Sequence, residues 1–92
     1  MSRFIVIHGV PVEATQQELI AGAKTVAASL PAGTEWLNSW AAGPSGRMFC
    51  EWEAPDAEAI RAALEPVKHL FPVEALHQVE WIDPAWYRPE TE

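Results

Sequence analysis

The sequence predicts an α+β fold whose strands and helices follow the order β-α-β-β-α-β. Two amphipathic helical patterns, four short runs of β-branched and aromatic residues, and turn residues between them lead to this prediction. With 92 residues, the chain is long enough for one sheet and one layer of helices. We therefore predict one domain over residues 1–92, a ferredoxin-like four-stranded antiparallel sheet with both helices on one face. Residues 84–92 are expected to form a loosely held tail.

The first half of the chain predicts a strand followed by a helix. Residues 4–8 are β-branched or aromatic, and a glycine and a proline soon follow them, which is typical of a strand and its end. Thr15 and Glu18 have the spacing of a capping box, and apolar residues then recur at helical spacing. This pattern predicts a helix over residues 15–30.

The second half predicts a hairpin, a second helix and a last strand. Two aromatic-rich runs, residues 34–41 and 47–53, flank four consecutive turn formers. Asp56 is a suitable N-cap for the helix that follows, and Pro66 is expected to end that helix or restart it as a short turn. Residues 76–82 predict the last strand.

Strand alternation predicts which side chains the helices leave uncovered. On the third strand we expect Cys50 to face the helices, because the alternative would bury the carboxylates of Glu51 and Glu53 without partners. On the last strand, we expect the side chains of Gln78, Glu80 and Ile82 to lie on the open face. Alternation leaves both orientations open for the first two strands. An uncovered sheet face and five tryptophans favour a homodimer joined through that face.

Composition excludes several kinds of partner. Thirteen acidic against six basic residues give a net charge of −7, so the chain lacks the clustered cations that nucleic acid or an anionic membrane surface requires. A single cysteine excludes an intrachain disulfide, and no apolar run approaches the length of a membrane span. We therefore expect a cytoplasmic protein that binds neither nucleic acid nor membrane.

Residues with chemical potential are few. Glu51 and Glu53 are two apart on one strand face, which places their carboxylates about 6.5–7 Å apart, and with a nearby histidine they could hold a divalent cation. His8 ends the first strand and His77 begins the last one. Solvated acids and structural histidines are the alternative reading, and Cys50 is expected to be a buried, inert thiol. Motifs for phosphate binding, zinc hydrolysis or nucleophilic catalysis are missing from the sequence, which favours a binding protein over an enzyme.

Three stretches, residues 35–40, 48–56 and 82–84, carry a resemblance to a known family. The chain resembles the small bacterial proteins of the domain-of-unknown-function group 4242 (DUF4242), some of which are described as nickel-binding. This resemblance implies a ferredoxin-like dimer with a sheet-to-sheet interface and a divalent metal such as nickel as the ligand. A more distant resemblance to dimeric α+β barrel proteins, which include small monooxygenases, implies an alternative enzyme acting on a small hydrophobic substrate. A structural module without a ligand is the third hypothesis.

The chain departs from the pattern of that family at two positions with consequences for a metal. Ile7 stands where the family often has an acidic residue, and Asn38 stands where it often has a histidine. Losing an acid and an imidazole weakens, moves or removes the metal site that the resemblance implies. The ligands that this chain would then use are His8, Glu51, Glu53 and His77. The residues that match the pattern are Cys50, Glu53, Ala54 and Pro55.

Overall fold

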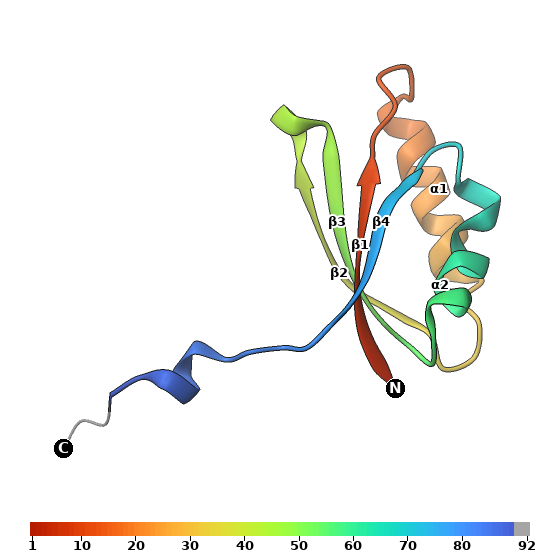
Figure 1. Ribbon diagram of the computed structural model, residues 1–92. Helices are drawn as coiled ribbons and strands as arrows, with labels where there is room; N and C mark the ends of the chain where they lie inside the picture. Colours follow the sequence, from red (N-terminus) through yellow and green to blue (C-terminus); the bar gives the residue numbers. More distant parts are fainter. Residues whose placement is uncertain (90–92) are drawn as a thin grey trace.

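Four antiparallel strands form one sheet in the order β2-β3-β1-β4 in the computed structural model, which describes residues 1–89 (Figure 1). Two helices cover one face of this sheet. The strands are β1 (Ser2–Gly9), β2 (Glu35–Ala42), β3 (Arg47–Ala54) and β4 (Val73–Val79). The predicted β-α-β-β-α-β order is confirmed, and the first and third strands lie at the centre of the sheet.

Both helices begin at the caps that the sequence predicts. In α1 (Gln16–Ala28), the Glu18 amide donates to the Thr15 hydroxyl at 3.1 Å and the Thr15 amide donates to the Glu18 carboxylate at 2.8 Å, which completes the capping box. α2 (Ala57–Leu64) is capped by Asp56, whose carboxylate accepts a hydrogen bond from the Ala59 amide at 3.0 Å. A 3-10 helix, η2 (Glu65–Val67), follows α2 at Pro66, as expected. Among the described residues, none of the helices is long and apolar enough to cross a membrane.

The hairpin of β2 and β3 contains an irregularity that alternation could not predict. The strands are joined by a 3-10 helix, η1 (Gly43–Ser45), and their register shifts between Trp36 and Asn38. Because the shift reverses the alternation of β2 at Leu37, Trp36 faces the helices while Asn38 faces the open side. Trp36 stacks on Trp52 with the ring centroids 6.0 Å apart.

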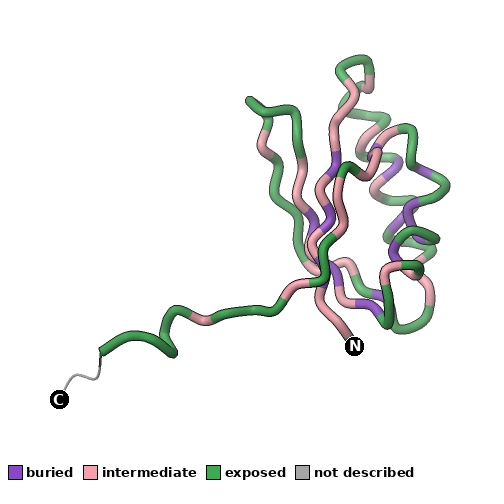
Figure 2. The backbone as a smooth tube through the Cα atoms, viewed as in Figure 1, coloured by how far each residue is buried: buried purple, intermediate pink, exposed green. Residues whose placement is uncertain are grey.

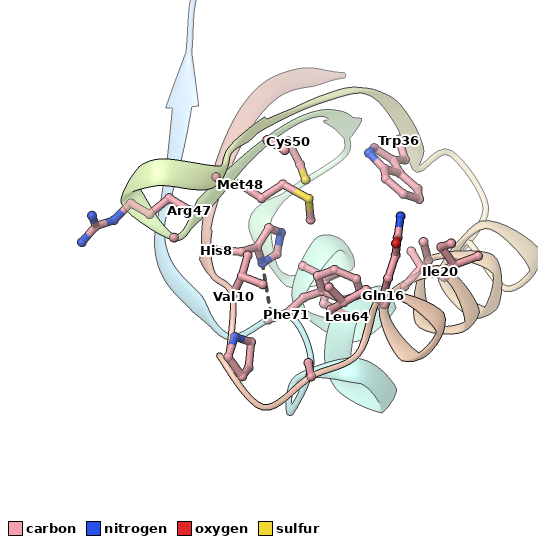
Figure 3. A pocket seen from close by; sticks show the side chains of 18 of the residues that line it. His8, Val10, Gln16, Ile20, Trp36, Arg47, Met48, Cys50, Leu64 and Phe71 are labelled. Carbon is pink, nitrogen blue, oxygen red and sulfur yellow. Dashed lines mark hydrogen bonds between the residues drawn. The ribbon is translucent and has the colours of Figure 1, made fainter.

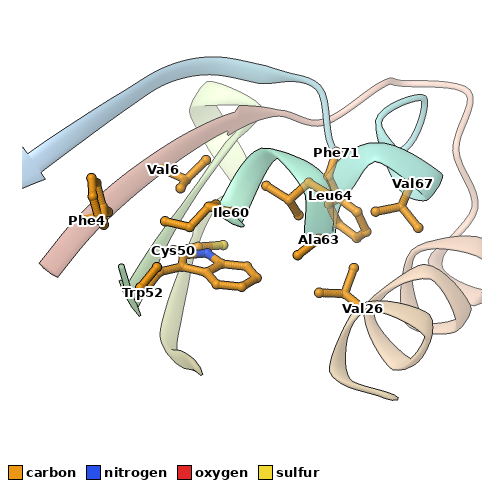
Figure 4. Packing of buried hydrophobic residues seen from close by; sticks show 11 residues of the cluster. Phe4, Val6, Val26, Cys50, Trp52, Ile60, Ala63, Leu64, Val67 and Phe71 are labelled. Carbon is orange, nitrogen blue, oxygen red and sulfur yellow. The ribbon is translucent and has the colours of Figure 1, made fainter. Parts of the chain in front are cut away.

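The core lies between the sheet and the helices (Figure 4). Alternate residues of β1 and β3 face it, so that buried and partly exposed positions alternate along both strands (Figure 2). Trp52 and Ile60 are its largest fully buried hydrophobic residues. Gly22 allows α1 to approach the segment after α2 closely, because a Cβ at this position would lie 2.9 Å from the Leu70 side chain and 3.1 Å from Phe71.

The orientation of β4 differs from the prediction. The prediction placed Gln78, Glu80 and Ile82 on the open face, and this is wrong. His77 pairs with Ile5, which faces away from the helices, so His77 lies on the open face and Gln78 on the helix side. The strand also ends at Val79, before Glu80. Glu80 therefore lies outside the strand, and its charge does not constrain which face of β4 is open.

The chain after β4 leaves the sheet and extends away from it (Figure 1). It contains a short 3-10 helix, η3 (Pro84–Tyr87), capped by the carboxylate of Asp83. The large hydrophobic residues of this segment are exposed by 60–72%; they are Trp81, Ile82, Trp86 and Tyr87. The tail predicted over residues 84–92 is thus described up to Pro89, and residues 90–92 lie outside the described part of the chain.

Candidate functional site

The open face of the sheet carries three rows of side chains that pair across neighbouring strands. In the order β2, β3, β1, β4, the rows are Glu35, Glu53, Arg3 and Val79; then Asn38, Glu51, Ile5 and His77; then Trp40, Phe49, Ile7 and Ala75. The first two rows hold every charged group of this set, and the third row is entirely apolar. We call this surface the open face; it has an acidic end and an apolar end.

Glu51 is engaged by donors of its own chain. One carboxylate oxygen accepts from Arg3 at 2.6 Å and the other accepts from Asn38 at 2.9 Å. The bond from Asn38 and then the bond from Arg3 hold the pKa of Glu51 below its ordinary value. A metal ion at Glu51 would have to replace both donors, so this predicted ligand is the least available one on the open face.

Glu53 lies in a different environment. It stands directly opposite Glu35 on β2, and the structure gives neither carboxylate an ion pair or a side-chain hydrogen bond within residues 1–89. Like charges directly opposite one another in a sheet are unfavourable. Glu35 was not among the predicted ligands, because the register shift of β2 hides from the sequence which side of that strand is open.

His8 lies on the other face of the sheet from Glu51, Glu53 and His77. It is 1% exposed, and its Nδ1 lies 3.0 Å from the carbonyl oxygen of Phe71. Because a carbonyl only accepts, Nδ1 carries the proton and Nε2 keeps its lone pair. Burial lowers the pKa of His8, so its imidazole is neutral at pH 7. The sheet therefore separates His8 from the three other predicted ligands.

The remaining predicted ligands do not converge in one chain either. β1 lies between the strands of Glu51 and His77, which places these two residues about 10 Å apart, twice the spacing of neighbouring strands. Within the part of the chain that the structure describes, no three His, Cys, Asp or Glu side chains are placed to share a metal ion. A single chain thus offers the open face a carboxylate pair and a distant imidazole.

A cavity of about 570 Å³ lies between the helix side of the sheet and α1 (Figure 3). Its size falls within the range of about 300–1,000 Å³ that is usual for small-molecule sites. His8, Met48 and Cys50 line it from the sheet, while Gln16 and Ile20 line it from α1. The sequence did not predict this cavity, because it depends on the pairing of β1 with β3 and on where α1 crosses them.

The structure confirms the predicted orientation of Cys50. It faces the helices, is 2% exposed, and its sulfur accepts a hydrogen bond from the Ser39 hydroxyl at 3.0 Å. Burial raises the pKa of the thiol, so it is protonated at neutral pH.

Comparisons with known proteins support both the fold and a family. The profile of a family described as nickel responsive protein SCO4226-like matches residues 4–79. The crystal structure of SCO4226 from Streptomyces coelicolor A3(2) is similar with a TM-score of 0.72 and 23% sequence identity, covering 89% of this chain and 100% of that one. The comparison with curated proteins finds no match.

Two further solved structures are similar in fold. The protein YJCS has a TM-score of 0.54 at 15% identity, with 89% of this chain and 100% of that chain covered. A putative antibiotic biosynthesis monooxygenase from Chloroflexus aurantiacus J-10-fl has a TM-score of 0.52 at 15% identity, with 89% and 95% covered. These likenesses confirm the ferredoxin-like fold. The resemblance to a nickel-related family is borne out at the level of the family profile, while membership of group 4242 stays a prediction.

Proposed function

Since the chain belongs to the SCO4226-like family of nickel-responsive proteins, we propose that it is a small metal-binding protein that takes up nickel as a homodimer. The open face is the proposed interface, and its acidic end is the proposed binding site. One observation carries this proposal: two carboxylates, those of Glu35 and Glu53, face each other on an uncovered sheet surface without a partner in the described chain.

The apolar end of the open face supports the dimer. Trp40, Phe49 and Ile7 form a continuous row across three strands, and neither helix covers them. Trp40 alone is 54% exposed. A contiguous exposed apolar surface beside polar groups is typical of an interface between subunits. If a second copy packed the same surface against this one, the apolar rows of both copies would be buried together, as a two-fold interface requires.

The tail supports the same assembly. Its exposed residues include two tryptophans whose rings are 5.3 Å apart, and the segment points away from its own sheet (Figure 1). In a dimer, this segment has the surface of the second copy to pack against. Burying large aromatic side chains supplies much of the free energy of association in protein interfaces.

A dimer also completes a ligand set. A divalent cation relieves the repulsion between Glu35 and Glu53, and carboxylate with imidazole is a donor set that suits nickel. A two-fold axis along the central strands would place β4 of one copy over β2 of the other. The partner's His77 then lies over Asn38, one row and about 6.5–7 Å along the strand from Glu35, and each dimer would hold two equivalent sites.

Titration of tag-free protein with Ni²⁺, combined with light scattering, tests the proposal. We expect saturable binding in a dimer, weakened in Glu53→Gln and His77→Gln, while Glu13→Gln, an exposed acid in a loop, serves as the matched control. Because an imidazole must be neutral to bind a metal, binding is expected to weaken from about pH 7.5 to about pH 5.5. A flat titration at both values contradicts the nickel proposal.

The cavity favours a second candidate function, the uptake of a small apolar molecule. Its walls are mostly aliphatic and aromatic, and the neutral imidazole of His8 is one of its few polar groups. Such a cavity suits a ligand with an apolar body and one hydrogen-bonding group, or the substrate of an enzyme in which His8 acts as acid or base. A thermal-shift screen with small aromatic compounds tests this candidate, and Leu19→Trp, which fills the cavity, is expected to abolish any shift.

A further inference from the structure

We propose that the cavity beneath α1 holds a second, separate metal site for copper(I), formed by the imidazole of His8, the thioether of Met48 and the thiol sulfur of Cys50. This site lies on the helix side of the sheet, so it shares no residue with the proposed nickel site on the open face. The proposal stands on the pairing of two strands, on the orientation of one imidazole, and on the charge of the cavity.

The register of β1 and β3 brings the three donors together. His8 is directly opposite Met48, and Val6 is opposite Cys50, so the three donors lie on one face of two neighbouring strands. Directly opposed side chains have Cβ atoms about 5 Å apart, and Cys50 follows two residues after Met48, at about 6.5–7 Å. Figure 3 shows all three side chains directed into the same cavity. On these spacings, one ion in the cavity could contact all three donors.

The imidazole of His8 is prepared for a metal. Its Nδ1 is held by the carbonyl oxygen of Phe71 at 3.0 Å, which fixes the ring and leaves the lone pair on Nε2. Metal-binding histidines commonly have this arrangement, in which the second ring nitrogen donates to a carbonyl or carboxylate.

The donor set and the surroundings select a soft, singly charged ion. Thiolate and thioether sulfur favour Cu(I), and imidazole also suits copper. When the ion binds, the Cys50 S–H bond is replaced by a copper–sulfur bond and the proton leaves to water. Thiolate and Cu(I) then sum to zero charge, whereas a divalent ion would leave a positive charge in an apolar cavity at a large desolvation cost.

One neighbouring donor supports an anionic sulfur at Cys50. The Ser39 hydroxyl already donates to this sulfur at 3.0 Å. The exposed side chains of Gln16 and Ile20 lie at the cavity wall, so an ion can enter from solvent.

Competition for Cu(I) tests the site. Tag-free protein is titrated without oxygen against a coloured Cu(I) chelator of known affinity, and we expect one ion per chain, with Ag(I) binding in its place. Ni²⁺ and Zn²⁺ in excess are expected not to displace it. Cys50→Ser should abolish binding, Met48→Leu should weaken it while keeping the side-chain volume, and Ser39→Ala should weaken it by about 10–100-fold through the lost hydrogen bond. Circular dichroism verifies that each variant is folded.

The matched control is His77→Gln on the open face. It should leave Cu(I) affinity unchanged while it weakens nickel binding, so the two metal proposals fail or succeed separately. Retention of all Cu(I) by the chelator overturns the site. Binding that survives in Cys50→Ser overturns it as well. Binding that is lost in Cys50→Ser but unchanged in both Met48→Leu and His8→Gln shows a simple thiol adduct, which also contradicts the three-donor site.

Discussion

Replacing Cys50 by serine tests whether this side chain is buried on the helix side of the sheet, where it lines the cavity. Cys50 is 2% exposed, and the Ser39 hydroxyl donates a hydrogen bond to its sulfur at 3.0 Å. A serine hydroxyl would bring a new donor into apolar surroundings, and burial of such a group costs about 1–3 kcal/mol in proteins. A 92-residue domain has a total stability of about 5–14 kcal/mol, so the variant should fold with a measurable loss.

Urea unfolding followed by tryptophan fluorescence measures this loss. Cys50→Ala is the matched control, because it removes the sulfur without adding a donor, and it should cost about 1 kcal/mol. We expect serine to lower the unfolding midpoint more than alanine, with an unchanged slope. The native thiol should also react slowly with a thiol reagent and quickly after unfolding. Fast labelling of the native protein, or a serine variant as stable as wild type, would refute the assignment of Cys50 to the core.

Three further predictions test other parts of the molecule. Phe49→Glu places a charge in the apolar row of the open face and should convert the dimer to a monomer in light scattering, while the circular dichroism spectrum stays the same. Deleting the chain after Glu80 should raise the dissociation constant of the dimer without unfolding the sheet; equal constants would exclude the tail from the interface. Burial lowers the pKa of His8, so the unfolded state takes up a proton at a higher pH than the folded state does. The free energy of unfolding should therefore decline as pH falls below the ordinary value of 6.5, and His8→Gln should remove this decline. Glu51, whose pKa is also lowered, should reduce the free energy of unfolding only below about pH 4.5.

Local signals in the sequence predicted the helices well, because the determinants of a helix lie within a few residues of one another. Thr15 and Glu18 form their capping box, Asp56 caps α2, and Pro66 ends it, each without help from distant parts of the chain. The orientation of β3 was also predictable, since burying Glu51 would have left a charge without solvent.

The faces of the edge strands could not be predicted in this way. One extra residue at Leu37 reverses the alternation of β2, and nothing in a single sequence marks that position. The predicted orientation of β4 was wrong because the strand ends before Glu80. The boundaries of a strand depend on the neighbouring strand rather than on its own residues alone. The prediction of the metal ligands was limited for the same reason. His77 lies on the open face, whereas His8 lies on the opposite face of the sheet.

The cavity and its donors depend on long-range register. His8 and Met48 are forty positions apart in the chain, and only the pairing of β1 with β3 shows that they are neighbours. A search for metal motifs by spacing does not consider such a pair, and a thioether is seldom counted as a ligand. The pairing of Glu35 with Glu53 is hidden for the same reason.

The central claim is that two copies join through the open face and bind nickel at its acidic end. Nickel titration of tag-free wild-type protein and of Phe49→Glu, with the mass measured in the same samples, tests it most directly. We predict a mass near twice 10.2 kDa with saturable binding for the wild type, and a monomer with strongly weakened binding for the variant, although every proposed ligand is still present. A wild-type monomer, or a monomeric variant that binds nickel as tightly as the wild type, would contradict the claim.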